Sequence, residues 1–263
     1  MFKKIFFLSM VVVLAGCSSV LLTGRKQLSL VTDQQVLALS DTSYQSFMAS
    51  AVLSTKTVEN AKVLRVGLKL KDAVETYLKA QGMDSELSNF SWSFKLVKDT
   101  AINAFCMPGG KIVVYEGILP VTKTEAGLAV VLGHEIAHAV AKHANERMSQ
   151  QMVASYGASA LSAILQNKSQ TTQTVAMTVF GLGAEYGVAL PYSRKQEFEA
   201  DRLGLIFMAM AGYDPQEAIV FWTRMSSTGK AYVPEFLSTH PSDSKRIANM
   251  NKVMPEALTF LKK

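Results

Sequence analysis

The strongest constraint on this chain of 263 residues is an apolar, helix-like segment that carries two histidines and a glutamate. His134 and His138 are four residues apart, and Glu135 directly follows the first of them. On a helix this spacing places the two imidazoles about 40° apart around the axis and one turn apart along it, so that they converge on one ion. Glu135 then lies beside the ion, where a base must stand to deprotonate a metal-bound water. The pattern predicts a catalytic zinc site.

The residues around this motif argue against a chance occurrence. Positions 128–140 are otherwise almost entirely apolar, and unliganded histidines with a glutamate inside a buried helix would be costly. The metzincin pattern is excluded, because it needs glycine and histidine where this chain has Ala141 and Ala144. His143 lies about 140° around the same predicted helix from His138, so it is expected to face away as a structural or surface histidine.

A catalytic zinc also needs a third protein ligand, and a charged segment far along the chain offers one. Glu197 and Asp201 are four residues apart on one face of a predicted helix, whereas Glu199 points to the opposite side. We expect Glu197 to bind the zinc and Asp201 to hydrogen-bond a ligating histidine. A solvated charged face is the alternative, because Arg194 and Lys195 lie nearby.

Together these motifs resemble the family of zinc metallopeptidases that includes the CAAX prenyl proteases, HtpX, BepA and LoiP. The resemblance extends over residues 26–250 and includes three further motifs: Asn103-Ala104-Phe105, Pro108-Gly109-Gly110, and Thr239-His240-Pro241 followed by Arg246-Ile247. It implies an α+β, predominantly α-helical gluzincin fold. In that fold an HExxH active-site helix lies beside a small antiparallel sheet whose edge strand binds substrate. It also implies that Glu197 is the third zinc ligand. The chain resembles the soluble or lipid-anchored members, so CAAX processing is not implied.

Two further groups of residues are expected at the site. Asn103, Ala104 and Phe105 would hold a peptide substrate, because an exposed strand edge binds an extended chain through main-chain hydrogen bonds. An ordinary hairpin with a polar end is the alternative for Asn103.

The resemblance places His240 by the zinc, where it would stabilise an oxyanion or hold the enzyme latent as a zinc ligand. The alternative is a loop-capping histidine. Arg246 would supply a second donor or orient His240.

The first 16 residues are predicted to be a lipoprotein signal peptide, because a short basic start precedes an apolar run at residues 5–15. Leu14-Ala15-Gly16-Cys17 resembles a bacterial lipobox, which implies cleavage before Cys17 and lipidation of its sulfur. An ordinary signal peptide is the alternative. We expect residues 17–32 to be a lipidated tether and residues 33–263 a single zinc metallopeptidase domain. The protein would be anchored in the cell envelope facing the periplasm, and Ser18 favours the outer membrane.

Hydrophobic spacing and turn residues predict the remaining elements. Helices are expected over residues 33–54, 58–81, 124–148, 193–210 and 214–226 and from residue 243, with a strand over 91–98 and a hairpin over 102–115. Residues 151–190 are rich in small side chains and predict two helices joined by a polar loop at 166–170. This segment would pack near the zinc or the membrane surface, or else form buried core helices.

Composition limits the other functions. The net charge is +6 without a block of lysine and arginine, which does not argue for nucleic-acid binding. Two cysteines exclude a disulfide framework, and Cys106 is expected to be a packed small residue rather than a nucleophile.

From the motifs and the resemblance we expect an endopeptidase with one zinc per chain, acting on misfolded or envelope proteins and in contact with outer-membrane protein assembly components. The alternatives are a chaperone-like or binding lipoprotein with little turnover, and a structural zinc site with four protein ligands.

Overall fold

The computed structural model describes residues 17–20, 22–185, 190–228, 235–240 and 244–261. The whole predicted signal peptide, residues 1–16, and Pro241 lie outside these residues. Contacts divide the chain into two units. We call residues 37–141 with 197–263 the site unit, and residues 1–36 with 142–196 the hairpin unit, and we describe each by itself.

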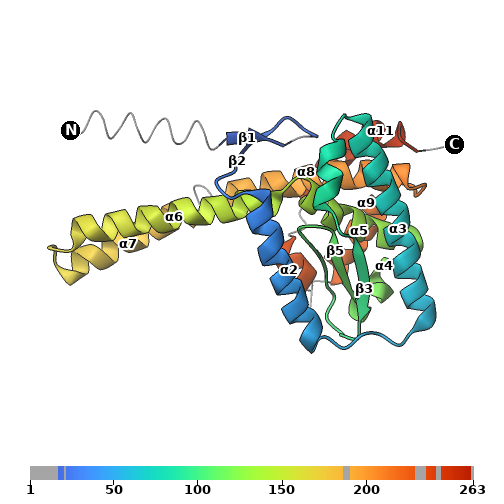
Figure 1. The fold of residues 1–263 in the computed structure, drawn as a ribbon, viewed down its shortest axis with the longest axis horizontal. Coiled ribbons are helices and arrows are strands. Elements are labelled where there is room, and N and C mark those ends of the chain that lie inside the picture. Colours follow the sequence, from blue (N-terminus) through green and yellow to red (C-terminus); the bar gives the residue numbers. More distant parts are fainter. Residues whose placement is uncertain (1–16, 21, 186–189, 229–234, 241–243, 262–263) are drawn as a thin grey trace. The chain divides into compact units, whose positions relative to one another are not determined.

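The site unit is built from helices around one small sheet (Figure 1). Its helices are most of α2 (Asp33–Ser50), α3 (Thr57–Ala80), α4 (Leu119–Thr122), α5 (Glu125–Val140), most of α8 (Leu190–Met210), α9 (Glu217–Thr228), α10 (Glu235–Thr239) and α11 (Ser244–Leu258), with short 3-10 turns η1 (Asp84–Asn89) and η2 (Glu116–Ile118). Its strands are β3 (Ser93–Val97), β4 (Ala104–Met107) and β5 (Lys111–Tyr115). These bounds confirm a predominantly helical α+β fold with a small sheet.

The sheet has the order β3-β5-β4 and is mixed rather than antiparallel. The β4–β5 hairpin is antiparallel as predicted, but β3 pairs with β5 in parallel. Strand β5 is the central strand, and its residues Ile112, Val113 and Val114 are all fully buried. A strand that is apolar on both faces belongs inside a sheet. Among the described strands β4 pairs only with β5, so the other side of β4 is an open edge.

Helix α5 carries the HExxH motif and is buried along nearly its whole length. Thr124 begins it as predicted, because its hydroxyl accepts a hydrogen bond from the amide of Gly127 at 3.0 Å. The prediction that this helix continues to Met148 is wrong. The helix ends at Val140, and Lys142 adopts a left-handed conformation with φ of 57°. The chain therefore changes direction before the next helix begins.

Two glycines let α5 and α8 cross with their backbones in contact. A Cβ atom on Gly204 would lie 2.9 Å from the backbone nitrogen of His134, and one on Gly133 would lie 3.0 Å from the Gly204 carbonyl. Any side chain at either position would push the two helices apart. The crossing brings the acidic residues of α8 next to the histidines of α5.

The hairpin unit contains the predicted tether, which has more regular structure than expected. Strand β1 (Cys17–Ser19) pairs antiparallel with β2 (Lys26–Leu28). Arg25 donates to both carboxylate oxygens of the buried Glu146 at 2.9 and 2.7 Å, and the amide of Leu30 donates to Ser149 at 2.8 Å. These contacts hold the segment against the start of α6 (His143–Leu165). The boundary of the metallopeptidase domain stays a prediction.

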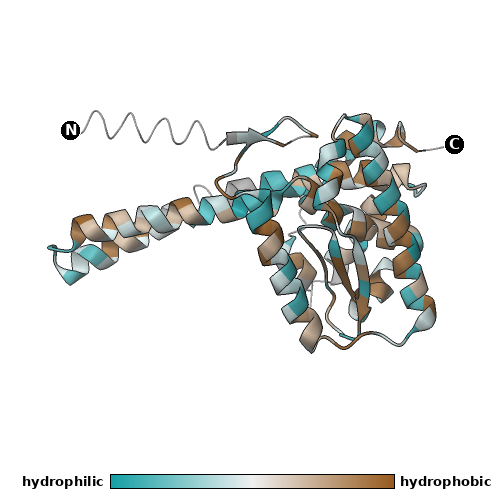
Figure 2. Ribbon diagram, in the orientation of Figure 1, coloured by the Kyte–Doolittle hydropathy of each residue, from teal (hydrophilic) through white to brown (hydrophobic). Residues whose placement is uncertain are grey.

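Helices α6 and α7 (Gln170–Ala184) run side by side and are joined by the predicted polar loop (Figure 1). Most of their side chains are exposed, and α7 contains no buried residue, so the buried-core alternative for residues 151–190 is wrong. Figure 2 shows apolar and neutral residues along the hairpin and hydrophilic residues at its tip. Within the described part of the chain, no helix has both the length and the hydropathy that a membrane span requires.

His143 is the first residue of α6 and is buried. The expectation that it continues the HExxH helix is wrong, because that helix has already ended at Val140. Among the described residues it is also not a member of the histidine and carboxylate group described below. A structural histidine, one of the roles expected for it, fits its burial.

Candidate metal centre

Helices α5 and α8 bring three potential metal ligands together. The Nε2 atoms of His134 and His138 are 3.1 Å apart. Glu197 reaches each of them with a carboxylate oxygen, at 3.3 Å in both cases. Ligand atoms bound about 2.0–2.1 Å from a tetrahedral zinc ion lie about 3.3 Å from one another. The three side chains therefore form a group that can bind a metal ion, and their spacing fits zinc.

Asp201 lies one helical turn beyond Glu197 and fixes the orientation of His134. Its Oδ1 atom is 3.0 Å from Nδ1 of His134, so the opposite ring nitrogen faces Glu197 and His138. Burial raises the pKa of Asp201, but the charge and hydrogen bonds of Arg246 outweigh it and hold that pKa below its ordinary value. Asp201 is therefore a carboxylate, which is the form that orients a ligating imidazole.

Arg246, from α11, completes this arrangement as a fully buried guanidinium. It donates to both oxygens of Asp201 at 2.7 Å and to the carbonyl of His240 at 3.2 Å. Its planar group lies over the ring of Trp222, 3.7 Å from the ring centre. Arg246 thus holds both Asp201 and the backbone at His240, as a residue that orients the site would do.

His240 follows α10 and points into the group. Its Nδ1 atom lies 3.1 Å from Glu197 and 3.2 Å from Nε2 of His134. Its ring packs against Phe236, with the ring centres 4.9 Å apart. One potential ligand atom from each of the two α5 histidines, Glu197 and His240 all lie within 4.8 Å of one another. His240 is therefore close enough to serve as a fourth ligand or as a donor.

Glu135 has a buried carboxylate with one oxygen that lacks a hydrogen bond among the described residues. Its side chain is buried, and within the described structure its Oε1 atom receives no hydrogen bond. The Nε2 atom of His240 lies 3.3 Å from that oxygen. A buried carboxylate oxygen without a hydrogen bond is unfavourable unless water, substrate or an ion completes it. This observation supports the fit of a metal with its bound water.

The titration of the group also favours a bound cation. Burial raises the pKa of Glu197, but hydrogen bonds from His134, His138 and His240 outweigh it and hold that pKa well below the ordinary value. Burial and Arg246 lower the pKa of His134, yet Asp201 and Glu197 outweigh them and raise it to about 9. The two carboxylates thus hold a positive charge at this position, and a metal ion would replace the proton.

Two of the three residues predicted to bind substrate, Ala104 and Phe105, lie on β4, and Asn103 directly precedes that strand, which packs against α5. Because the amide of Tyr115 donates to the carbonyl of Asn103, alternation along the hairpin turns the backbone groups of Phe105 toward β5. The backbone of Ala104 and Cys106 therefore faces the open edge. The side chain of Asn103 accepts from the amide of Ala104 at 2.9 Å, so it already occupies one group on this edge.

Phe105 and Cys106 differ from a simple substrate-binding pair. The ring of Phe105 packs edge-on against Phe47 of α2, with the ring centres 5.3 Å apart. Burial, and to a lesser degree the nearby Glu135, raise the pKa of Cys106 well above its ordinary value. The thiol is therefore protonated at neutral pH, which fits a packed residue rather than a nucleophile.

Three contributors to the site were missed from the sequence. Trp222 supports Arg246, Phe236 supports His240, and Gly204 allows the helix crossing. Of these, only Gly204 could have been recognised in the sequence, because glycine is unfavourable inside an otherwise apolar helical run.

Comparisons with known proteins agree with this geometry. A sequence model of peptidase family M48 matches residues 67–254. The mitochondrial metalloendopeptidase OMA1 of Schizosaccharomyces pombe is 40% identical over 177 residues, which is 66% of this chain and 50% of that protein. The human metalloendopeptidase OMA1 is 32% identical over 243 residues, or 90% of this chain and 46% of that protein. A protein of Vibrio cholerae described as a putative beta-barrel assembly-enhancing protease is 31% identical over 163 residues, or 60% of this chain and 34% of that protein. The chain thus spans half or less of the length of these relatives.

Proposed function

This chain belongs to peptidase family M48, and on that premise we propose that it is a zinc-dependent endopeptidase with one zinc per chain. The observation that supports this most directly is the spacing of 3.1–3.3 Å between the ligand atoms of His134, His138 and Glu197, beside a buried Glu135 oxygen that has no hydrogen bond. The proposed substrates are misfolded or envelope proteins.

When bound, zinc would polarise the scissile carbonyl and make water more acidic. Glu135 takes a proton from the attacking water as the oxygen bonds to the carbonyl carbon, and it passes that proton to the amine as the C–N bond breaks. Asp201 and Arg246 keep His134 oriented during these steps. The backbone of Ala104 and Cys106 at the open edge of β4 would hold the substrate extended.

The experiment measures metal content and casein digestion on one purified sample. The Glu135→Gln variant should retain its zinc and lose activity roughly 10²–10⁴-fold, because the proton acceptor is gone. Glu59→Gln on α3, a glutamate that pairs with Lys62 away from the site, serves as the matched control and should cleave like the wild type. Absence of cleavage by the zinc-loaded wild type would instead favour the chaperone-like or binding alternative.

His240 has two proposed roles that one variant separates. Its ring lies among the ligands, so it would either stabilise the oxyanion or ligate zinc in a latent enzyme. His240→Ala with normal zinc content and a kcat lower by roughly 10²–10³-fold supports oxyanion stabilisation. Raised activity in the same variant supports latency. Unchanged activity and zinc content would reject both roles.

The proposed location is the cell envelope, with a lipid anchor at Cys17 that faces the periplasm, most simply on the outer membrane. The lipobox-like residues and Ser18 support it, as does the description of the Vibrio cholerae relative as a putative beta-barrel assembly-enhancing protease, while the OMA1 relatives are described as mitochondrial. A role beside outer-membrane assembly components is proposed on the same ground. The mass of the mature protein checks the anchor, since lipidation requires cleavage before Cys17 and added acyl mass.

A further inference from the structure

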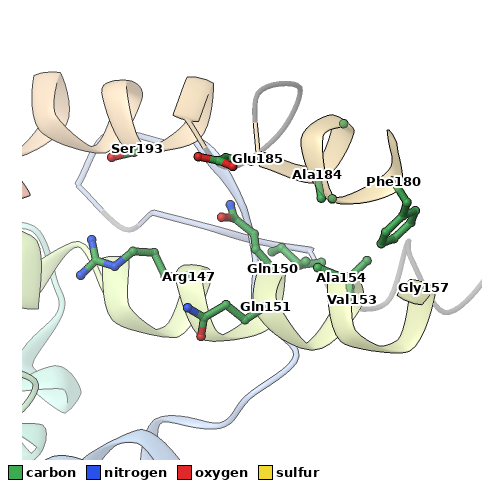
Figure 3. A pocket seen from close by; sticks show the side chains of 13 residues that line it. Arg147, Gln150, Gln151, Val153, Ala154, Gly157, Phe180, Ala184, Glu185 and Ser193 are labelled. Atoms are coloured by element: carbon green, nitrogen blue, oxygen red, sulfur yellow. The ribbon is translucent and has the colours of Figure 1, made fainter. Parts of the chain in front are cut away.

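The hairpin unit contains a cavity of about 860 Å³ that the proposed peptidase chemistry does not use (Figure 3). Its walls come from β2, α6, α7 and the beginning of α8. The volume falls within the range of about 300–1,000 Å³ that is usual for small-molecule sites. The apolar part of the lining includes Leu28, Val153, Ala154, Phe180 and Ala184.

The lining is polar at one end and apolar at the other. Figure 3 shows Arg147 and Ser193 together at one end and Gly157 and Phe180 at the opposite end, with Ala154 on the wall between them. Arg147 and Gly157 are ten residues apart on α6, which corresponds to about 15 Å along the helix. The cavity is therefore elongated as well as polarised.

The helices are kept apart by their own contacts rather than by side chains inside the cavity. At the apolar end a Cβ atom on Gly157 would lie 2.8 Å from the ring of Phe180, so the helices already touch there. Val179 and Leu182 on α7 are exposed, and Val153 lines the cavity while about half exposed. An apolar space of this size loses packing energy if it stays empty.

We propose that this cavity binds one long, unbranched aliphatic chain, with the polar end of the ligand beside Arg147. An elongated, largely apolar cavity with polar residues toward one end matches an acyl chain in both shape and polarity. A peptide is disfavoured, because it would need hydrogen-bonding partners along the whole cavity, whereas the described polar side chains gather toward one end.

The register of the N-terminal strands indicates where such a chain would come from. Cys17 in β1 pairs directly with Leu28 in β2, and Leu28 lines the cavity. The residue proposed to carry the lipid is therefore the backbone pairing partner of a residue that lines the cavity. An acyl chain of Cys17 or of a neighbouring membrane lipid has the same chemistry. Only the first source rests on the proposed lipid anchor.

The test uses cis-parinaric acid, a fluorescent fatty acid, with the full-length Cys17→Ser protein and with the lipidated mature protein. The Cys17→Ser protein should bind the probe. Ala154→Trp, which fills the cavity from α6, should weaken that binding at least tenfold. Ala160→Trp places the same side chain at an exposed position of the same helix outside the cavity lining and serves as the matched control. Ala184→Trp fills the cavity from α7 if the first variant does not fold.

The two sources give different results. If the chain on Cys17 occupies the cavity, the lipidated protein excludes the probe, whereas a membrane lipid as ligand leaves both forms able to bind it. Absence of probe binding by the Cys17→Ser protein, or equal binding by the cavity-filling and control variants, would overturn the proposal. Casein digestion on the same samples reports separately on the proposed peptidase.

Discussion

The two units of this molecule treat charge in opposite ways. The site unit buries six titratable or charged side chains close together, each within 3.3 Å of another member of the group: His134, Glu135, His138, Glu197, Asp201 and Arg246 with His240 beside them. The hairpin unit has only Lys168 as a charged residue between positions 148 and 184, and its apolar side chains are largely exposed. The site unit gathers buried charged groups beside one another, whereas the α6–α7 hairpin leaves much of its apolar surface exposed.

The same contrast appears in how each unit uses glycine. In the site unit Gly133 and Gly204 have no room for a side chain, because helix backbones meet there. In the hairpin unit Gly181 and Gly183 face open space, where a Cβ atom would meet no atom within 4 Å. Packing therefore requires glycine where α5 and α8 cross and leaves room for a side chain at these two positions of α7.

Removing the buried guanidinium should have the largest effect on this contrast. Arg246→Met leaves the Asp201 carboxylate buried without its bidentate partner, and breaking a buried ion pair costs about 3–5 kcal/mol. Urea denaturation of the metal-free protein measures the loss. Adding Asp201→Asn removes the orphaned charge and should restore part of the stability.

The control for this variant is an ion pair at the surface. Arg202 pairs with Glu256 at 2.6 Å, but both side chains are about one third exposed or more. Arg202→Met should therefore cost only about 0.2–1 kcal/mol. Equal losses for the two arginines would mean that burial does not distinguish the two ion pairs of the site unit.

A methyl group at the helix crossing should have the next largest effect. Gly204→Ala places its Cβ atom 2.9 Å from the backbone of His134, and overpacking of this kind costs about 1–3 kcal/mol. The shift would also separate Glu197 from the α5 histidines, so zinc affinity should fall together with stability. Urea denaturation and a zinc titration measure the two effects, and unchanged values for both would show that the crossing is not tight.

The same substitution in the hairpin unit should have the smallest effect and the opposite sign. Gly181→Ala lies in α7 with open space around it, so the variant should gain about 0.5–1 kcal/mol from the lower entropy of the unfolded chain. Zinc affinity should stay unchanged. A clear destabilisation would indicate that this part of α7 is more closely packed than its exposure implies.

Much of the fold could be predicted from the sequence because its signals are local. The apolar stripe of α3, the cap at Thr124 and the turn at Pro108-Gly109-Gly110 all depend on neighbouring residues, and the structure confirms them. The spacing of Glu197 and Asp201 likewise predicted that both lie on one helix face, and both reach the α5 histidines.

The remaining features depend on contacts between distant segments. Nothing near Lys142 marks the end of the HExxH helix, since the surrounding residues are good helix formers, so the break was missed. The parallel pairing of β3 with β5 follows from which strand is most deeply buried, which alternation within β3 does not reveal. The support of Arg246 by Trp222 joins two helices whose sequences show no sign of each other.

The chain leaves the site unit after Ala141 and returns at Glu197, so the whole hairpin segment is an insertion between two proposed metal ligands. An ion held by His138 and Glu197 would close a loop of 59 residues, counted as 197 − 138. Closing a loop of that length in the unfolded chain corresponds to about 4 kcal/mol at 25 °C on the chain-entropy scale used for disulfides. The metal would then act as a reversible crosslink. Removing it with a chelator would return this conformational entropy to the unfolded chain and would also dismantle the proposed catalytic centre.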